Sequence, residues 1–284
     1  MDQREWPVRE WRLPVLGASV WVVEVGEGEP IVMLHGGPGA SHDYLRPQMD
    51  RLAAAGRRWV YYDQRGGGRS MLSEGVQPGT VDEHVADLER LRVHLGVERL
   101  SILGYSWGGL LGMLFALGHR DRVGRMALMS PAPSHAGARA AMLENLRLAD
   151  KRREVAELKE SLGIAELSLR DPVAARQARF AIAVNGYFVE PRRGLELTPF
   201  RVQQRSEQAV WKSLGEFDLR ERLPSLRGIP SLVVHGREDP IPFASAVETA
   251  SLIGAKLVAL DRCGHVPYIE APKPLFAALD AFFA

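Results

Sequence analysis

A serine flanked by glycines is the sharpest chemical signal in the sequence. The run Gly104-Tyr105-Ser106-Trp107-Gly108 fits the pattern G-x-S-x-G, and it lies between a strand-like apolar run and a run with helical spacing. In such a tight turn the serine hydroxyl is lifted above the strand end, and small residues two before and two after it leave the space. The Trp107 N–H would then stand at a helix N-terminus, where it can donate to an oxyanion. The pattern predicts a nucleophilic serine.

A serine hydroxyl needs a base, and the base needs an orienting acid. Of eight histidines, only His265 follows the last predicted strand in a glycine-containing loop. The acid predicted is Asp239, which follows the strand expected at 229–234. Its neighbour Glu238 is the rival, but the Gly-x-x-Asp turn aims the second carboxylate inward. The chain order Ser106, Asp239, His265 is the one found where G-x-S-x-G follows a strand of an α/β sheet.

A glycine-rich loop, residues 35–39 with the sequence HGGPG, follows the predicted strand 31–34. Its glycines let the backbone approach a substrate closely. The N–H groups of Gly37 and Trp107 are expected to form the pair that binds the oxyanion. His35 is expected to brace this loop. A phosphate-binding role is disfavoured because no Gly-Lys-Ser/Thr follows.

A second glycine-rich run, residues 63–70 with the sequence DQRGGGRS, follows the predicted strand 58–62. We interpret it as a structural turn beside the site, with Asp63 either pairing with Arg65 or capping backbone amides. The single cysteine, Cys263, is expected to be a small packing residue and not a second nucleophile.

Strands and helices alternate through both ends of the chain, which favours a parallel sheet with right-handed crossovers. Residues 130–212 instead lack strand patterns and are helical. The sequence therefore predicts a core of residues 1–130 and 214–284 with a helical cap at 131–213. Strands are expected at 20–25, 31–34, 58–62, 100–103, 125–129, 229–234 and 256–260, and helices at 43–55, 80–95, 106–117, 244–253 and 273–283.

Composition excludes several classes of function. The 284 residues carry 36 Lys+Arg and 35 Asp+Glu, so a net charge of +1 gives no strong field for nucleic acid or a membrane surface. The cap's 14 basic and 10 acidic residues are interspersed, as on a solvated helical face. One cysteine cannot form an internal disulfide, and there is neither a signal-peptide pattern nor a long apolar run. We expect a cytoplasmic protein without cofactor or metal; its oligomeric state stays open.

Three motifs together, HGGPG (35–39), DQRGGGRS (63–70) and GYSWGG (104–109), resemble the α/β-hydrolase superfamily and, within it, the proline iminopeptidase family. The stretch 35–45 is similar to the tricorn-interacting aminopeptidase branch. The resemblance implies a mostly parallel eight-stranded sheet flanked by helices, with an inserted helical cap. It also implies release of N-terminal residues, often proline, from short peptides. Ser106, Asp239 and His265 match the family's triad, and Gly37 and Trp107 match its oxyanion donors.

The family reads the substrate's free amine with carboxylates near the cap. Glu207 resembles one of them, whereas Pro240 and Val184 stand at two other positions where family members carry glutamates. Several apolar cap residues could line an acyl pocket or pack within the cap: Leu146, Phe180, Tyr187, Phe188 and Trp211.

Three functions remain open on the sequence. The first is a proline iminopeptidase-type aminopeptidase that acts on short peptides, and the second is a carboxylesterase or related acyl hydrolase with no need for a free amine. The third, a binding module without catalysis, is disfavoured by the complete set of Ser, Asp, His and oxyanion residues.

Overall fold

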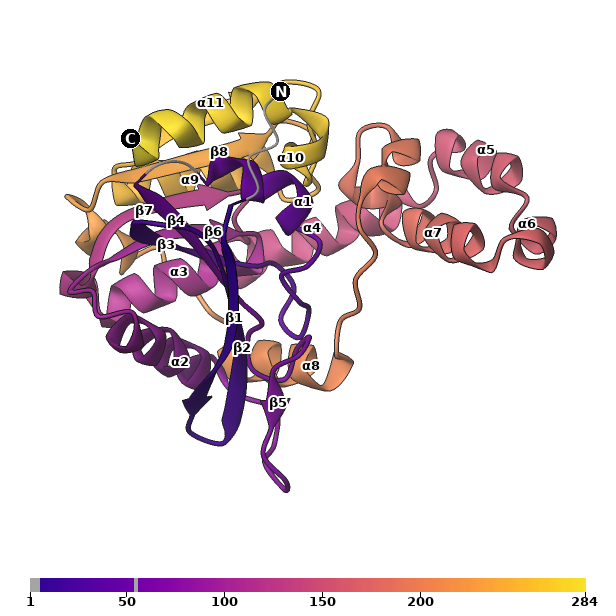
Figure 1. Ribbon diagram of the computed structural model, residues 1–284. Coiled ribbons are helices and arrows are strands. Elements are labelled where there is room, and N and C mark those ends of the chain that lie inside the picture. Colours follow the sequence, from indigo (N-terminus) through magenta and orange to yellow (C-terminus); the bar gives the residue numbers. More distant parts are fainter. Residues whose placement is uncertain (1–5, 54–55) are drawn as a thin grey trace.

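A central, mostly parallel β-sheet carries helices on both faces in the computed structural model, which describes residues 6–53 and 56–284 (Figure 1). The strand order is β1-β2-β4-β3-β6-β7-β8-β9, with β5 paired to β2. The pairs of β2 with β1, β4 and β5 are antiparallel, and those from β4–β3 onward are parallel. The strands are β1 (Val8–Val15), β2 (Ala18–Gly26), β3 (Glu29–Leu34), β4 (Arg57–Tyr62), β5 (Met71–Leu72), β6 (Leu100–Tyr105), β7 (Val123–Met129), β8 (Ser231–Gly236) and β9 (Lys256–Leu260).

The central strands of the sheet present alternate residues to two separate apolar cores. Val32 belongs to the core under α2, α3 and α9, whereas its neighbour Met33 belongs to the core under α1, α10 and α11. Such two-sided burial is typical of parallel sheets covered by crossover helices. The helices of this layer are α1 (Arg46–Met49), η1 (Asp50–Leu52), α2 (Val81–His94), α3 (Trp107–Gly118), η2 (Arg120–Arg122), η5 (Leu223–Leu226), α9 (Phe243–Ile253), α10 (Pro267–Glu270) and α11 (Pro272–Phe283).

The predicted mostly parallel sheet is confirmed, with three differences. A short strand, β5, brings the described strands to nine instead of the eight expected. The edge strand β1 was not expected, although Trp11, Leu13 and Val15 alternate along it and pack on the core under α2, α3 and α9. The helix expected at 43–55 is present only in part: α1 begins at Arg46 and gives way at Asp50 to the 3-10 helix η1, which ends at Leu52. Residues 1–5 and 54–55 lie outside the described residues.

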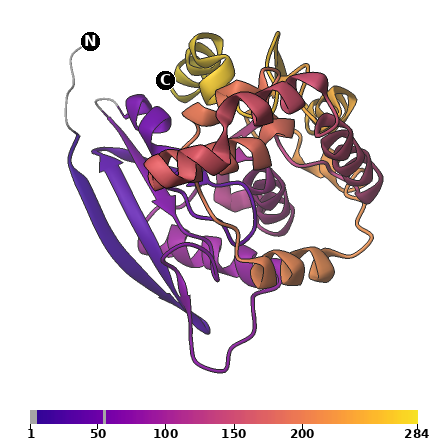
Figure 2. The ribbon, with the colours of Figure 1, turned by 90° about the vertical axis from the view of Figure 1, so that its right-hand side faces the viewer.

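Helices fill the first part of the segment between β7 and β8, and we call residues 131–213, the bounds predicted from the sequence, the cap. Its helices are α4 (Ala136–Ala149), α5 (Arg153–Leu162), α6 (Ile164–Arg170), α7 (Pro172–Ala183), η3 (Asn185–Tyr187), η4 (Pro191–Glu196) and α8 (Gln204–Leu214), which ends one residue beyond these bounds. Helices α5, α6 and α7 project from the sheet, and α8 lies apart from them (Figures 1 and 2).

Several hydrogen bonds join the cap to the sheet layer, and two places show how they do so. The segments entering and leaving the cap pair with each other, since Ala136 N–H donates to Phe217 O at 2.9 Å and Leu219 N–H donates to Ser134 O at 2.9 Å. Helix α8 packs on α2, where Val81 N–H donates to Ser213 Oγ at 3.0 Å. In the described part of the chain, no helix combines the length and apolarity needed to cross a membrane.

Candidate active site

Ser106 occupies a strained turn between β6 and α3. Its backbone has φ 52° and ψ −119°, a conformation that non-glycine residues rarely adopt. The flanking glycines are sterically required. A Cβ at Gly104 would lie 2.6 Å from Gly108 O, and one at Gly108 would lie 2.0 Å from Leu34 O. The backbone here has no room for side chains, and the strain points to a functional serine.

Loops that follow β8 and β9 bring Asp239 and His265 to the serine. Ser106 Oγ lies 3.0 Å from His265 Nε2, and both carboxylate oxygens of Asp239 lie 3.0 Å from His265 Nδ1. In the tautomer with a proton on Nδ1, the ring donates to Asp239 and accepts the serine proton at Nε2. The three residues chosen from the sequence are thus brought together in one hydrogen-bonded series.

Asp239 is held as a buried carboxylate. Burial raises its pKa, but the charges of His265 and His235 and the N–H of Ile241 at 2.8 Å outweigh burial, and its pKa is lowered. Its rival Glu238 faces elsewhere, because it accepts the N–H of Cys263 at 3.1 Å. The geometry therefore favours Asp239 as the partner of His265.

The N–H groups of Gly37 and Trp107 are the oxyanion donors that the sequence predicts. Trp107 is the first residue of α3, where a helix leaves its N–H without an internal partner. Gly37 lines the same cavity as Ser106 and has φ 67°, a value that suits glycine. The N–H of Gly36 is already donated to Tyr44 Oη at 2.8 Å. The pairing of Gly37 with Trp107 around an oxyanion stays a prediction.

Gln64 was missed by the sequence analysis, yet it ties the two oxyanion elements together. Its N–H donates to His35 Nε2 at 3.1 Å and its side-chain amide donates to His35 O at 2.9 Å. Its Oε1 accepts from Trp107 Nε1 at 2.7 Å. His35 thus braces the loop as expected. The sequence offered one signal for this role: Gln64 lies two residues after the end of strand β4, at the edge of the sheet where the site forms.

Asp63 does not pair with Arg65, so the first of its two predicted roles is wrong. It accepts the backbone N–H groups of His42 at 2.9 Å and Arg69 at 2.7 Å, which is the amide-capping role. Burial opposes its charge, but the His42 side chain and these amides lower its pKa to about 2. Arg65 turns to α2 instead, where it binds Asp87 through two bonds of 2.6 and 2.7 Å.

A cavity of about 90 Å³ opens beside Ser106 and His265. Tyr187 and Glu207 line it, as expected of substrate-binding residues. Phe188 does not line it; its side chain is buried in the core under α1, α10 and α11. The other lining residues are Gly36, Gly37, Tyr44, Tyr105, Leu197, Phe200, Val202, Val266 and Tyr268.

Glu207 brings a half-buried carboxylate to this cavity from α8. Burial raises its pKa, and the nearby Arg139 guanidinium partly offsets that effect. Pro240 and Val184, which stand where family members carry glutamates, bring no charge to the cavity. The Pro240 carbonyl accepts from Asn145 Nδ2 at 2.8 Å, and Val184 is buried at the end of α7. A cation bound in the cavity would therefore face a single carboxylate, Glu207, among its lining residues.

The remaining apolar cap candidates pack away from the serine. Trp211 stacks edge-on against Trp107 at 5.5 Å, and Phe180 packs on Phe200 at 5.3 Å. Leu146 lines a different hollow, between α4 and η3. Cys263 is buried, and burial raises the pKa of its thiol, which agrees with a packing role.

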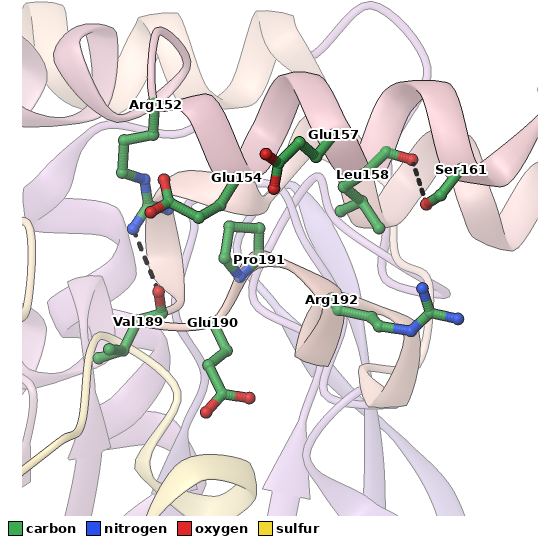
Figure 3. A pocket seen from close by; sticks show the side chains of 9 residues that line it. All are labelled: Arg152, Glu154, Glu157, Leu158, Ser161, Val189, Glu190, Pro191 and Arg192. Carbon is green, nitrogen blue, oxygen red and sulfur yellow. Dashed lines mark hydrogen bonds between the residues drawn. The ribbon is translucent and has the colours of Figure 1, made fainter.

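A larger cavity, about 550 Å³, lies within the cap between α5 and the segment 189–192. Figure 3 shows Glu154 and Glu157 of α5 above Pro191, with the Arg152 guanidinium donating to the Val189 carbonyl. None of its lining residues belongs to the Ser106 site. Among residues 6–53 and 56–284, no group of three or more His, Cys, Asp or Glu side chains is placed to hold a metal ion.

Comparison with known proteins places this arrangement in context. The family profile described as alpha/beta hydrolase fold matches residues 29–272. A proline iminopeptidase of Lactobacillus helveticus is 25% identical over 284 residues, which cover 95% of this chain and 96% of the relative. The solved structure of a proline iminopeptidase-related protein from Thermus thermophilus is 27% identical with a TM-score of 0.74, covering 98% of this chain and 97% of that one. An esterase from Exiguobacterium antarcticum, 21% identical with a TM-score of 0.65 over 95% of this chain and 97% of its own, shares the fold.

Proposed function

Because the chain belongs to the α/β-hydrolase fold family, we propose that it is a serine hydrolase that forms an acyl-enzyme on Ser106. The observation that carries the proposal is the hydrogen-bonded series of Ser106, His265 and Asp239, with each donor–acceptor distance at 3.0 Å. A serine so placed has both a base to take its proton and a carboxylate to stabilise the imidazolium that results.

The reaction proceeds in two balanced halves. Ser106 Oγ attacks the substrate carbonyl carbon while its proton passes to His265 Nε2, and the carbonyl electron pair moves onto oxygen. The N–H groups of Gly37 and Trp107 hold that oxyanion; one such donor is typically worth about 10²–10³ in rate. The tetrahedral adduct then expels the amine or alcohol, which takes the proton from Nε2. Water, deprotonated by the same imidazole, releases the acyl group and restores Ser106.

We propose that the substrate is a short peptide whose N-terminal residue is released, often proline. Glu207 supports this reading because a carboxylate in a partly dry cavity offers an ammonium ion the paired charge it needs there. The cavity is small, and Leu197 and Phe200 make part of its wall apolar, which suits a compact acyl residue. Two relatives carry the name proline iminopeptidase or a related one. A cytoplasmic location, which we also propose, rests on composition: the single cysteine forms no internal disulfide.

A carboxylesterase or acyl hydrolase without a free-amine requirement is the second candidate. The observation that favours it is the single lining carboxylate, since Pro240 and Val184 stand where resembling enzymes carry further glutamates.

A panel of three substrates separates the two candidates: proline p-nitroanilide, its N-acetylated form, and p-nitrophenyl butyrate. An aminopeptidase cleaves the first far faster than the second. Glu207→Gln is expected to raise KM about tenfold or more for the free amine while leaving ester hydrolysis nearly unchanged. Glu216→Gln, an exposed carboxylate just beyond α8, is the matched control. Equal rates on free and blocked amides, or activity on the ester alone, would decide for the esterase.

A further inference from the structure

A single carboxylate joins the catalytic histidine loop to the cap. Glu270, at the end of α10, accepts the N–H of Gly264 at 2.7 Å through Oε2. Through Oε1 it accepts the N–H of Val189 at 2.8 Å. Gly264 directly precedes the catalytic base, and Val189 lies in the cap. One carboxylate oxygen of Glu270 therefore binds the loop that carries His265, and the other binds the cap.

Other contacts make this junction tight. His265 N–H donates to Tyr187 O at 2.7 Å, two residues before Val189. A Cβ at Gly264 would lie 2.5 Å from Tyr187 O, so the loop and the cap meet backbone to backbone. Arg152 holds the same cap segment from its other side, donating to Phe188 O at 3.1 Å. The position of the His265 backbone is therefore defined by the cap segment 187–189.

We propose that Glu270 is a positioning residue, which keeps His265 in line with Ser106 by bonding the loop before it to the cap. The inference rests on the proposed serine-hydrolase function. Because each carboxylate oxygen has its own N–H donor, loss of either acceptor frees one side of the junction. The base is then held by the Tyr187 carbonyl and by Tyr105, whose hydroxyl donates to His265 O at 3.0 Å.

The charge on Glu270 matters because only the ionised carboxylate offers two full acceptors. Burial raises its pKa to about 6, with the N–H groups of Val189 and Gly264 opposing that effect. Arg193 from η4 favours its charge and Asp239 disfavours it. The buried thiol of Cys263 and the His265 ring lie on the loop it binds. Helices α1 and α11 also pack against α10. Arg46 of α1 pairs with Asp50 of η1 and Asp280 of α11 pairs with Arg57, whereas Lys273 of α11 is exposed.

The test uses the rate at which a fluorophosphonate labels Ser106, because this step needs the base but no identified substrate. Glu270→Gln keeps the shape and places an N–H₂ against one of the two backbone donors. We expect a labelling rate about 10- to 100-fold lower, the scale of a small misplacement of a catalytic group. The acid limb of the wild-type pH profile should contain an additional ionisation near pH 6, which Glu270→Gln removes and the charged variant Glu270→Asp retains. Glu160→Gln, an exposed carboxylate of the cap helix α5, is the matched control.

The outcomes separate this inference from the function on which it rests. If wild type is labelled and the labelling rate of Glu270→Gln lies within twofold of it, with the same pH profile, the positioning role is overturned. An unlabelled wild type would instead overturn the proposed function. If Glu270→Gln fails to fold, the profiles of wild type and Glu270→Asp decide: an acid limb with a single ionisation in both contradicts the proposal.

Discussion

Two adjacent carboxylates, Glu238 and Asp239, contact different groups although they are neighbours in the sequence. They follow the same strand, β8, yet Glu238 accepts the Cys263 N–H and Asp239 faces the His265 ring. Both acids thus act on the β9–α10 loop, one on its backbone and one on its imidazole. Only the second can stabilise an imidazolium and fix its tautomer.

Asp239→Asn tests that distinction. An amide of the same shape presents N–H₂ to Nδ1 and favours the tautomer whose Nε2 carries a proton and cannot accept one from Ser106. We expect kcat to fall about 10⁴-fold, measured on p-nitrophenyl butyrate, with the thermal midpoint little changed. Glu238→Gln is the control and should lose less than tenfold. Similar losses in the two variants would contradict the assignment.

At this scale the sequence predicts the members of the hydrogen-bonded series Ser106, His265 and Asp239 better than the residues that surround it. Ser106, Asp239 and His265 could be chosen because each follows a recognisable strand in a fixed order. Gln64 and Glu270 could not, since their partners are backbone groups or side chains far along the chain. Of the two roles left open for Phe188, lining the pocket is wrong, because an apolar residue type does not distinguish a side chain that faces a cavity from one that faces the adjacent core.

At the scale of elements, buried polar links set how the loops meet the helices. Arg65, in the loop after β4, is almost fully buried and reaches α2, where it bonds Asp87 and Glu83. The capping box of Thr80 and Glu83 begins that helix, which the sequence predicted over residues 80–95. Helix α2 thereby anchors the loop that carries Gln64, and through it the oxyanion elements.

Asp87→Asn is expected to destabilise the fold by about 3 kcal/mol, because it removes the buried one of the two carboxylates that pair with the buried Arg65 guanidinium and leaves only the more exposed Glu83. Urea unfolding measures the change. Asp280→Asn, which removes a partly exposed pair with Arg57, should cost less than about 1 kcal/mol. If the two variants lose equal stability, the buried Arg65–Asp87 pair does not stabilise the fold more than the partly exposed Arg57–Asp280 pair.

Elements were predictable where the local pattern and the tertiary context agree. Helix α2 has a cap, an apolar stripe and a following glycine, and it forms where expected. The helix expected at 43–55 has a start signal, Pro47 in the first turn of α1, yet it gives way to the 3-10 helix η1 after Met49. The strand β1 alternates at Trp11, Leu13 and Val15, but its pairing with β2 is visible only in the fold.

At the scale of the whole molecule, buried histidines beside the candidate site make the free energy of unfolding depend on pH. His35 supports the oxyanion loop, and His84 of α2 packs edge-on against Trp107 at 6.0 Å. Burial lowers the pKa of His35 to about 4 and that of His84 to about 3. Both are neutral in the folded chain at a pH where the unfolded chain, with histidine near 6.5, begins to take up protons.

Stability is therefore expected to fall as pH drops below about 6.5 toward 4, by up to about 1.4 kcal/mol per pH unit for each histidine. Glu270 acts in the opposite direction, since its raised pKa lets the folded state bind a proton first between about 6 and 4.5. Urea unfolding at several pH values measures the slope. His84→Asn should reduce it by about one histidine's share; an unchanged slope would show that His84 does not titrate on unfolding.

The covalent labelling of Ser106 tests the central claim most directly. The protein is incubated with a fluorophosphonate, and the modified peptide is located by mass spectrometry. The account predicts one adduct per chain, on Ser106, that forms at least 10²-fold more slowly in His265→Ala and is absent in Ser106→Ala. An unlabelled wild-type protein, or an adduct that persists on another residue in Ser106→Ala, would contradict it.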